Sequence, residues 1–297
     1  MGGNRTHMKI VFFGTPDYVL PILKAVHKAF VTGPGKSPIT AVVTQSPKPV
    51  GRKQILAYSP IDKWAHDHKL PIYYSANELV ENPTEATLGI LASYGEIIRK
   101  EVINLFPQGI LVIHPSLLPK YRGASPVPAT IANGDEIAGA SIIKMDEKMD
   151  HGPIVSQFKE PVLPDDTAES LRNRLFERSA GVLVEMLTPY VHGKIKLKPQ
   201  DEDAATFTKL MKREDGYVSL NEKSPIEVER IIRAMQPWPG AWTSIQLSEK
   251  DTGNKRLKLL AAHMEGERLE LDEVQLEGKD PVSFKQFKGG YPTAKFI

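Results

Sequence analysis

Two residues of this chain are placed to move protons, His114 and Asp150. His114 ends the apolar run 109–114 and is followed by a loop bracketed by prolines, and Asp150 lies in the turn after the run 140–145. Imidazole exchanges protons near neutral pH, and a nearby carboxylate orients it and stabilises its charged form. A single histidine can equally be a core residue satisfied by backbone groups, but the prolines indicate a loop of defined shape. The spacing therefore predicts an acid–base pair at strand ends.

Strand-like and helix-like segments alternate through the first 190 residues. Short apolar runs indicate strands at 9–13, 39–44, 88–92, 109–114, 140–145 and 154–158. Helical patterns cover 18–30, 59–68, 97–105 and 167–190, and Ser59 with Pro60 is typical of a helix start. Runs that are apolar on both faces are typical of central parallel strands covered by helices. The alternation predicts an α/β fold with a Rossmann-like parallel sheet.

The carboxyl ends of the strands in such a sheet form the edge at which ligands bind. Four strand ends carry distinctive residues: Gly14-Thr15, Tyr94-Gly95, His114 and the Asp150 turn. We therefore expect these residues to share one site. The turn at Gly14 lacks the GxGxxG fingerprint, so neither NAD nor FAD is expected.

The composition of the sequence changes after the long helix predicted at 167–190. Polar residues from 191 onward indicate a linker, and beyond it one helix (225–235) precedes four short strand candidates: 242–247, 256–263, 269–276 and 282–287. Short strands separated by glycine-containing turns predict a small OB-like β-barrel. The expected organisation is a tag or disordered lead-in (1–7), a catalytic domain (8–190), a linker (191–206) and a carboxyl-terminal domain (207–297).

The amino-acid composition excludes several kinds of site. The 297 residues carry a formal net charge of +2, which does not by itself indicate a nucleic-acid binder. There is no cysteine, which excludes disulfides, thiolate metal sites and a cysteine nucleophile, and fits a reducing cytoplasm. No apolar run reaches the roughly 18 residues of a membrane span.

Several motifs together carry a resemblance to a known family. They are Phe13-Gly14-Thr15-Pro16-Asp17, Val43-Thr44-Gln45, Pro49-Val50-Gly51-Arg52, His114-Pro115-Ser116-Leu117-Leu118-Pro119, Tyr121-Arg122-Gly123, the Met145–Gly152 turn and Pro237-Trp238-Pro239-Gly240-Ala241-Trp242. The chain resembles the 10-formyltetrahydrofolate-dependent formyltransferases from residue 9 to about residue 290. The Pro-Trp-Pro-Gly element after a long linker is similar to that of the family members that act on methionyl-tRNA.

The resemblance implies a reaction and its partners. The formyl group of 10-formyltetrahydrofolate would pass to the amino group of initiator methionyl-tRNA for translation initiation, without a metal. His114 and Asp150 would handle charge and protons in a tetrahedral intermediate. The implied folate-binding residues are Tyr94, Gly95, Glu96, Ile97, Ile98, Ser116, Leu117, Leu118, Pro119, Asp146 and Asp150. The implied tRNA-binding residues are Lys48, Arg52, Lys53, Lys196, Lys198, Lys255 and Arg256.

Three features depart from the family pattern. Val112 stands where the family has an asparagine that donates a hydrogen bond to the formyl oxygen, and losing such a donor costs on the order of 100- to 1000-fold in rate. Either transfer is slow, or a backbone N–H or His114 supplies the donor, or catalysis is lost. His151 follows Asp150 where the family often has threonine. The segment 265–280 is acidic, unlike an RNA-binding surface.

Alternative functions stay open at this point. One is a formyltransferase for an amino-sugar nucleotide, and another is a catalytically impaired relative that binds folate or tRNA. A third is a hydrolase that transfers the formyl group to water. We expect a cytoplasmic monomer that does not bind membranes.

Overall fold

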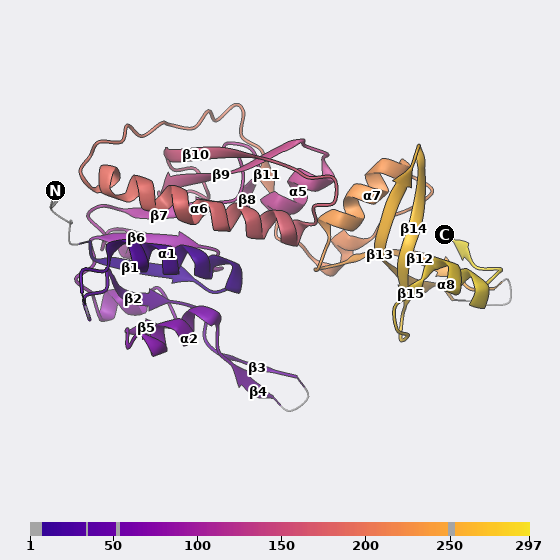
Figure 1. Cartoon of the computed structure of the whole chain (residues 1–297), viewed down its shortest axis with the longest axis horizontal. Coiled ribbons are helices and arrows are strands. Elements are labelled where there is room, and N and C mark those ends of the chain that lie inside the picture. The colour runs from indigo at the N-terminus through magenta and orange to yellow at the C-terminus, as the bar shows by residue number, and fades with distance from the viewer. Residues whose placement is uncertain (1–7, 34, 52–53, 249–252) are drawn as a thin grey trace. The chain divides into compact units, whose positions relative to one another are not determined.

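The structure, a computed structural model, describes residues 8–33, 35–51, 54–248 and 253–297 (Figure 1). The expected lead-in at 1–7 lies outside these residues. The first 206 residues contain β1 (Ile10–Gly14), η1 (Asp17–Val19), α1 (Leu20–Phe30), β2 (Ile39–Val43), β3 (Lys48–Val50), β4 (Ile55–Ala57), α2 (Pro60–Asp67), β5 (Ile72–Tyr73), α3 (Glu78–Glu81), β6 (Leu88–Ala92), α4 (Lys100–Ile103), β7 (Ile110–His114), β8 (Arg122–Gly123), α5 (Pro126–Ala132), β9 (Ile137–Lys144), β10 (Ile154–Pro161) and α6 (Ala168–Val191).

The remaining elements are β11 (Phe207–Thr208), η2 (Arg213–Gly216), α7 (Pro225–Ala234), β12 (Ala241–Gln246), β13 (Lys255–Glu265), β14 (Arg268–Leu276), β15 (Val282–Ser283), α8 (Phe284–Gly290) and β16 (Lys295–Phe296). Contacts within the chain define two compact units. The first comprises Met1–Arg122, Gly139–Glu160 and Asn173–Thr206, and the second comprises Gly123–Ala138, Pro161–Arg172 and Phe207–Ile297. The domain limits predicted at residues 190 and 206 stay predictions.

A seven-stranded sheet in the order β10-β9-β7-β6-β1-β2-β5 forms the centre of the first unit. The pairs β1–β2, β1–β6, β6–β7 and β2–β5 are parallel, whereas β7 and β9 are antiparallel. Every residue of β1 and β7 is buried, as the apolar runs predicted. The parallel strands bring the ends of β1, β6 and β7 to one edge of the sheet.

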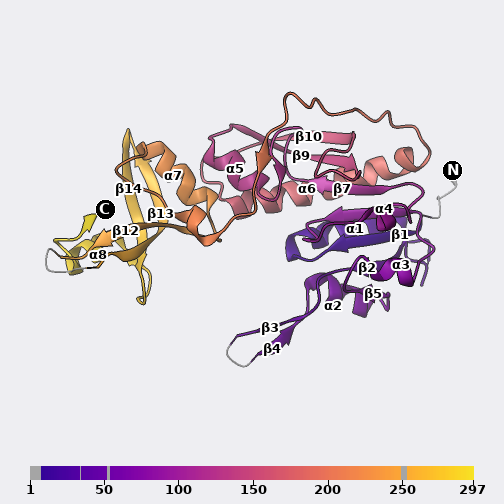
Figure 2. The same cartoon turned by 180° about the vertical axis from the view of Figure 1, so that it is seen from behind.

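Helices cover both faces of this sheet (Figures 1 and 2). On one face Phe12 packs with residues of α1, α2 and α6, and on the other Phe13 packs with residues of α3 and α4. Alternation of buried side chains along β1 therefore supplies a core on each side. The predicted α/β class with a mainly parallel sheet is confirmed.

The second unit contains a five-stranded sheet in the order β15-β14-β13-β12-β16, in which neighbouring strands are antiparallel. Its core includes Val228 and Ile232 of α7, Leu257 and Leu259 of β13, and Phe287 of α8. A second domain of antiparallel strands, as the sequence predicted, is thus present, and its strands β13 and β14 are 11 and 9 residues long.

Two predicted elements are wrong. Residues 282–287 were expected to be a strand, but only Val282–Ser283 is extended, and α8 starts at Phe284. Ser283 caps this helix by accepting from the N–H of Gln286, whose side chain returns the contact, and this capping box outweighs the strand propensity. The helix expected at 97–105 covers only Lys100–Ile103, and Arg99 before it is extended, with φ −76° and ψ 156°.

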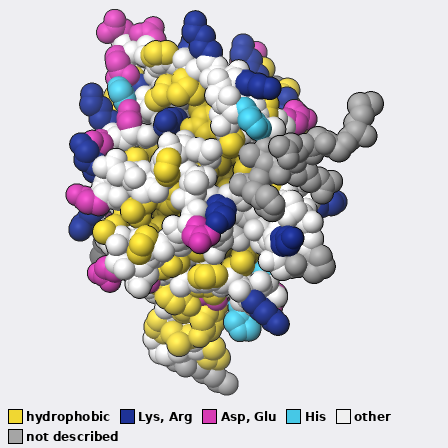
Figure 3. Space-filling model, turned by 90° about the vertical axis from the view of Figure 1, so that its left-hand side faces the viewer, with side chains coloured by type: hydrophobic (Ala, Val, Ile, Leu, Met, Phe, Trp, Pro, Cys, Tyr) yellow, Lys and Arg dark blue, Asp and Glu magenta, His cyan; other side chains and the backbone are white. Residues whose placement is uncertain are grey.

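The insertion after β2 forms the hairpin β3–β4. Val50, Ile55 and Leu56 of this hairpin are all more than half exposed. Figure 3 shows hydrophobic side chains gathered on the projection at the bottom of the view, which is this hairpin. Among the described residues, no helix has the length and apolar character needed to cross a bilayer.

Candidate active site

The structure brings His114 and Asp150 together, as the sequence predicted. His114 is the last residue of β7 and is 5% exposed. Its Nδ1 lies 3.5 Å from Oδ2 of Asp150, whose side chain is 18% exposed. Asp150 has a φ of +48°, a left-handed conformation that asparagine and aspartate adopt more readily than most residues. The backbone of the turn therefore aims the carboxylate at the imidazole.

The second imidazole nitrogen fixes the proton arrangement of this pair. Nε2 of His114 lies 2.9 Å from the carbonyl oxygen of Tyr121, which can only accept, so Nε2 carries a hydrogen. In a neutral imidazole Nδ1 would then present a lone pair to Asp150. A proton placed on Nδ1 would lie between the imidazole and the Asp150 carboxylate. The arrangement is that of a group that can take up and release one proton.

The loop after His114 is held by polar side chains from β9 and β10. The hydroxyl of Ser141 donates to the carbonyl of Ser116 and accepts from the N–H of Leu118. Gln157 donates to the carbonyl of Leu118 and to the hydroxyl of Ser141. These contacts fix the shape of the loop that the bracketing prolines predicted.

Val112 is packed rather than polar. Its side chain is 7% exposed and contacts a small apolar cluster with Leu118 and Ile143, against which Leu91 and Met145 pack. Because residues 112 and 114 lie two apart on one strand, their side chains share a face of the sheet. The position of the family's asparagine is therefore beside the His114–Asp150 pair and is filled here by hydrocarbon.

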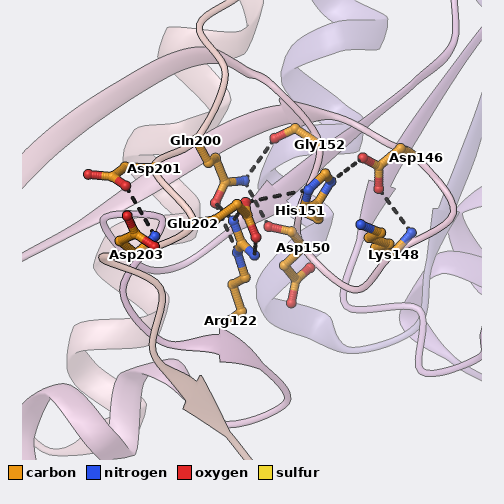
Figure 4. A network of polar contacts seen from close by, with 10 residues as sticks. All are labelled: Arg122, Asp146, Lys148, Asp150, His151, Gly152, Gln200, Asp201, Glu202 and Asp203. Atoms are coloured by element: carbon orange, nitrogen blue, oxygen red, sulfur yellow. Dashed lines mark hydrogen bonds and ion pairs between the residues drawn. The ribbon is translucent and has the colours of Figure 1, made fainter.

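A buried arginine and the segment expected to be a linker form a polar network beside the Asp150 turn (Figure 4). Arg122, only 2% exposed, donates to both carboxylate oxygens of Glu202 and to Oε1 of Gln200. Gln200 Nε2 in turn donates to the carbonyls of Asp150 and Gly152, at 2.8 Å each. Sequence reasoning missed these roles because the partners lie 78 or 80 residues from Arg122 along the chain.

His151 joins the same network. Its Nδ1 lies 2.5 Å from Oδ2 of Asp146 and its Nε2 lies 3.4 Å from Oε1 of Glu202. The histidine that replaces the family's threonine is thus engaged with carboxylates on both sides. No metal ligand set of three or more His, Cys, Asp or Glu side chains occurs among the residues that the structure covers.

Glu202→Gln is expected to remove an acid-sensitive part of the free energy of unfolding. Hydrogen bonds from Arg122 hold the pKa of Glu202 below its ordinary value. A carboxyl whose folded pKa is lowered stabilises the fold above its unfolded pKa, and this contribution disappears as the pH falls through the folded value. Urea unfolding from pH 7 downward should show a steeper loss for the native chain than for Glu202→Gln below about pH 5. The difference should be small because Glu202 is 57% exposed, and parallel curves would contradict it.

The residues predicted to bind folate differ in what they expose. The Tyr94 ring is buried in the core, where its hydroxyl donates to Glu96 and accepts from the N–H of Ala76. Burial raises the pKa of this phenol well above its ordinary value. Ser116 and Leu118 are buried, whereas Ile97 is 87% exposed. Glu96 is exposed as well, and Gly95, Ile98, Leu117, Pro119 and Asp146 are exposed or half-buried. Only part of this set presents side chains to a ligand.

The residues predicted to bind tRNA occur in both units. Lys48, Lys196 and Lys198 are exposed in the first unit, and Arg52 and Lys53 lie outside the described residues. In the second unit Lys255 pairs with Glu277 at 3.2 Å. The Arg256 guanidinium stacks over the Trp242 ring, 3.9 Å from its centroid.

Comparison with known proteins places this site in a family. Residues 8–187 match the family model described as formyl transferase, and residues 210–268 match the formyl transferase carboxyl-terminal domain. The chain belongs to the formyl transferase family. The expectation of a formyl-transferring enzyme is therefore confirmed, and the two matched segments follow each other as the sequence predicted.

Two relatives show which members of the family the chain is similar to. The methionyl-tRNA formyltransferase of Chloroflexus aggregans is 39% identical over 242 residues, which cover 80% of this chain and 76% of that protein. The methionyl-tRNA formyltransferase of Herpetosiphon aurantiacus is 32% identical and covers 95% of this chain and 98% of its own length. The predicted resemblance to the methionyl-tRNA members of this family is therefore confirmed.

Solved structures show the same fold. The methionyl-tRNA formyltransferase from Clostridium thermocellum has a TM-score of 0.60 at 20% identity, over 91% of this chain and 98% of that one. A sugar 3N-formyl transferase solved in the presence of dTDP and 5-N-formyl-THF has a TM-score of 0.65 at 18% identity, over 92% and 99%. At these identities the similarity is one of fold.

Proposed function

We propose that this formyl transferase moves the formyl group of 10-formyltetrahydrofolate to the amino group of methionyl-tRNA. The main support for this reaction is the His114–Asp150 pair at the end of β7, which can exchange one proton. The named relatives, which are methionyl-tRNA formyltransferases, support the choice of acceptor. We place the reaction in the cytoplasm, and the protein as a monomer, without a metal.

The proposed formyl transfer removes one proton and adds one, and the His114–Asp150 pair can do both. The acceptor nitrogen forms a bond to the formyl carbon while the bond from that carbon to N10 of the folate breaks. The amine loses one proton and N10 gains one, so a group that accepts and returns a single proton serves both events. His114 and Asp150 provide such a group, and the buried position of His114 excludes bulk water from it.

The folate donor fits the surroundings of the pair. Its flat pteridine ring needs apolar contacts and a few polar groups that fix its orientation. The exposed side chain of Ile97 near the end of β6 offers an apolar contact, whereas the cluster of Val112, Leu118 and Ile143 beside His114 is buried. The Asp146–Asp150 turn offers carboxylates and backbone groups that can fix the orientation.

The tRNA acceptor fits a basic and aromatic surface in the second unit. The Tyr217 and Trp242 rings lie 4.9 Å apart, and Arg256 stacks on Trp242. Lys258 stands opposite Trp242 in the β12–β13 pair. Basic side chains beside exposed aromatic rings neutralise phosphates and stack on bases. Arg256 can therefore contact RNA through its charge while Trp242 holds it in place.

Arg256→Ala is expected to weaken tRNA binding and to lower the slope of log affinity against log salt concentration by about one, as for the loss of one phosphate contact. Filter binding of initiator tRNA at several salt concentrations measures both quantities. Arg268→Ala is the control, because Arg268 is also an exposed arginine, on β14. Equal slopes for the native chain and Arg256→Ala would remove Arg256 from the tRNA surface.

An acceptor panel tests the proposed function. The protein is supplied with 10-formyltetrahydrofolate and, separately, with methionyl-tRNA, an amino-sugar nucleotide, or no acceptor. Formyl-methionyl-tRNA as the main product supports the proposal. A formylated sugar nucleotide, or formate released without an amine, would replace it with a sugar formyltransferase or a hydrolase.

A further inference from the structure

We propose that Gln200 is a positioning residue for formyl transfer, which fixes the Asp150 turn so that its carboxylate faces His114. The inference rests on the proposed function for its kinetic test. Gln200 lies in the polar segment after α6, and it contacts the backbone of the turn rather than the reacting groups. It therefore acts through Asp150.

The turn needs an external support. Asp150 is held at a positive φ, a conformation that costs energy for a residue with a side chain. Gly152 is equally constrained, because a Cβ there would lie 1.9 Å from the carbonyl oxygen of Lys144. The two hydrogen bonds from Gln200 Nε2 fall on the carbonyls of these two residues. They hold the segment on both sides of His151.

The orientation of the Gln200 amide is fixed from its other end. Its Oε1 accepts from Nε and Nη2 of Arg122, at 3.0 and 2.9 Å. Arg122 can only donate, so the amide oxygen must face it and Nε2 must face the turn. Glu202 binds Arg122 through both carboxylate oxygens, which holds the guanidinium in place. Figure 4 shows these groups converging from three segments of the chain.

The consequence is kinetic. A displacement of the Asp150 carboxylate by about 1 Å can cost on the order of 100-fold in rate. Loss of the Gln200 contacts should therefore lower kcat, and it should also raise the KM for the folate donor, because the same turn offers polar groups to the pteridine. A residue that only stabilised the fold would lower the amount of folded protein without this pattern.

The test compares Gln200→Met with Gln236→Met. Gln236 is a matched control, because it is a half-buried glutamine of the second unit that donates to the carbonyl of Leu260. Gln200→Met is expected to lower kcat by about 100-fold, and Gln236→Met to leave it unchanged. Gln200→Glu adds a second test, because its carboxylate can still accept from Arg122 but cannot donate to the turn, and it should also lose rate.

Two further readouts separate positioning from stability. The ¹⁵N signal of His114 Nδ1 in the protein without tRNA should move in Gln200→Met toward its position in Asp150→Asn. In the double variant Asp150→Asn/Gln200→Met, the second change should add almost nothing to the loss in kcat, since both act through one group. An unmoved His114 signal, additive losses or an unchanged rate in Gln200→Glu would overturn the proposal. The NMR readout needs no acceptor, so it stands apart from any failure of the proposed function.

Discussion

Asp150→Asn is expected to lower kcat for formyl transfer by about 10²- to 10⁴-fold, the range over which a positioned acid–base group contributes. The carboxylate faces Nδ1 of His114, and an asparagine amide in its place could neither accept nor return a proton. His114→Ala should cause a loss of the same order. The fold should survive, because asparagine tolerates the left-handed backbone of position 150.

The chain contains a matched control for this prediction. His263 and Asp272 form a second His–Asp pair, 2.9 Å apart, on the exposed surface of the second unit. Asp272→Asn should keep the native kcat. Circular dichroism and thermal unfolding would confirm that each variant is folded. A native rate in Asp150→Asn would show that the reacting groups lie elsewhere.

Val112→Asn is expected to raise kcat by about 100- to 1000-fold, which is the value of one hydrogen-bond donor to a developing oxyanion. The new amide would stand on the same strand face as His114 and two residues before it. The gain should come with a cost of about 1–3 kcal/mol in the free energy of unfolding, because the amide enters the apolar cluster of Leu118 and Ile143. Steady-state kinetics and urea unfolding measure the two effects.

Val112→Ala separates the new donor from the loss of packing. This variant leaves a small cavity in the same cluster and introduces no polar group, so it should lose stability without gaining rate. If Val112→Asn is no faster than the native chain, another donor already acts on the formyl oxygen. A backbone N–H or His114 would then supply it.

Local signals in the sequence predicted much of the fold. The strand at 88–92 was predicted with its observed limits, and Ser59 caps α2 as expected because the cap requires only neighbouring residues. The error at 282–287 was also local. Ser283 and Gln286 have the spacing of a capping box, which is typical of a helix start rather than of a strand.

The candidate site, like the fold, has residues that the sequence predicted and residues that it did not. His114 and Asp150 could be identified from the sequence, since one ends an apolar run and the other lies in the turn after another. The reason for their meeting was not predicted: β7 and β9 are antiparallel, so the turn after β9 has to bring Asp150 back to the end of β7. The supporting contacts could not be found, because Gln200 and Glu202 reach Arg122 across a long stretch of chain. The composition of the segment 191–206 is that of an ordinary polar linker. It does not indicate that Gln200 supports the turn that contains Asp150.

Single-turnover formylation tests the central claim most directly. The protein, in excess over methionyl-tRNA and saturated with 10-formyltetrahydrofolate, is quenched at a series of times, and formyl-methionine is measured by mass spectrometry. We predict that formyl-methionyl-tRNA accumulates with the native chain, and at least 100-fold more slowly with Asp150→Asn, as expected for the loss of an acid–base group. Absence of product with both the native chain and Val112→Asn, or equal rates for the native chain and Asp150→Asn, would contradict the assignment.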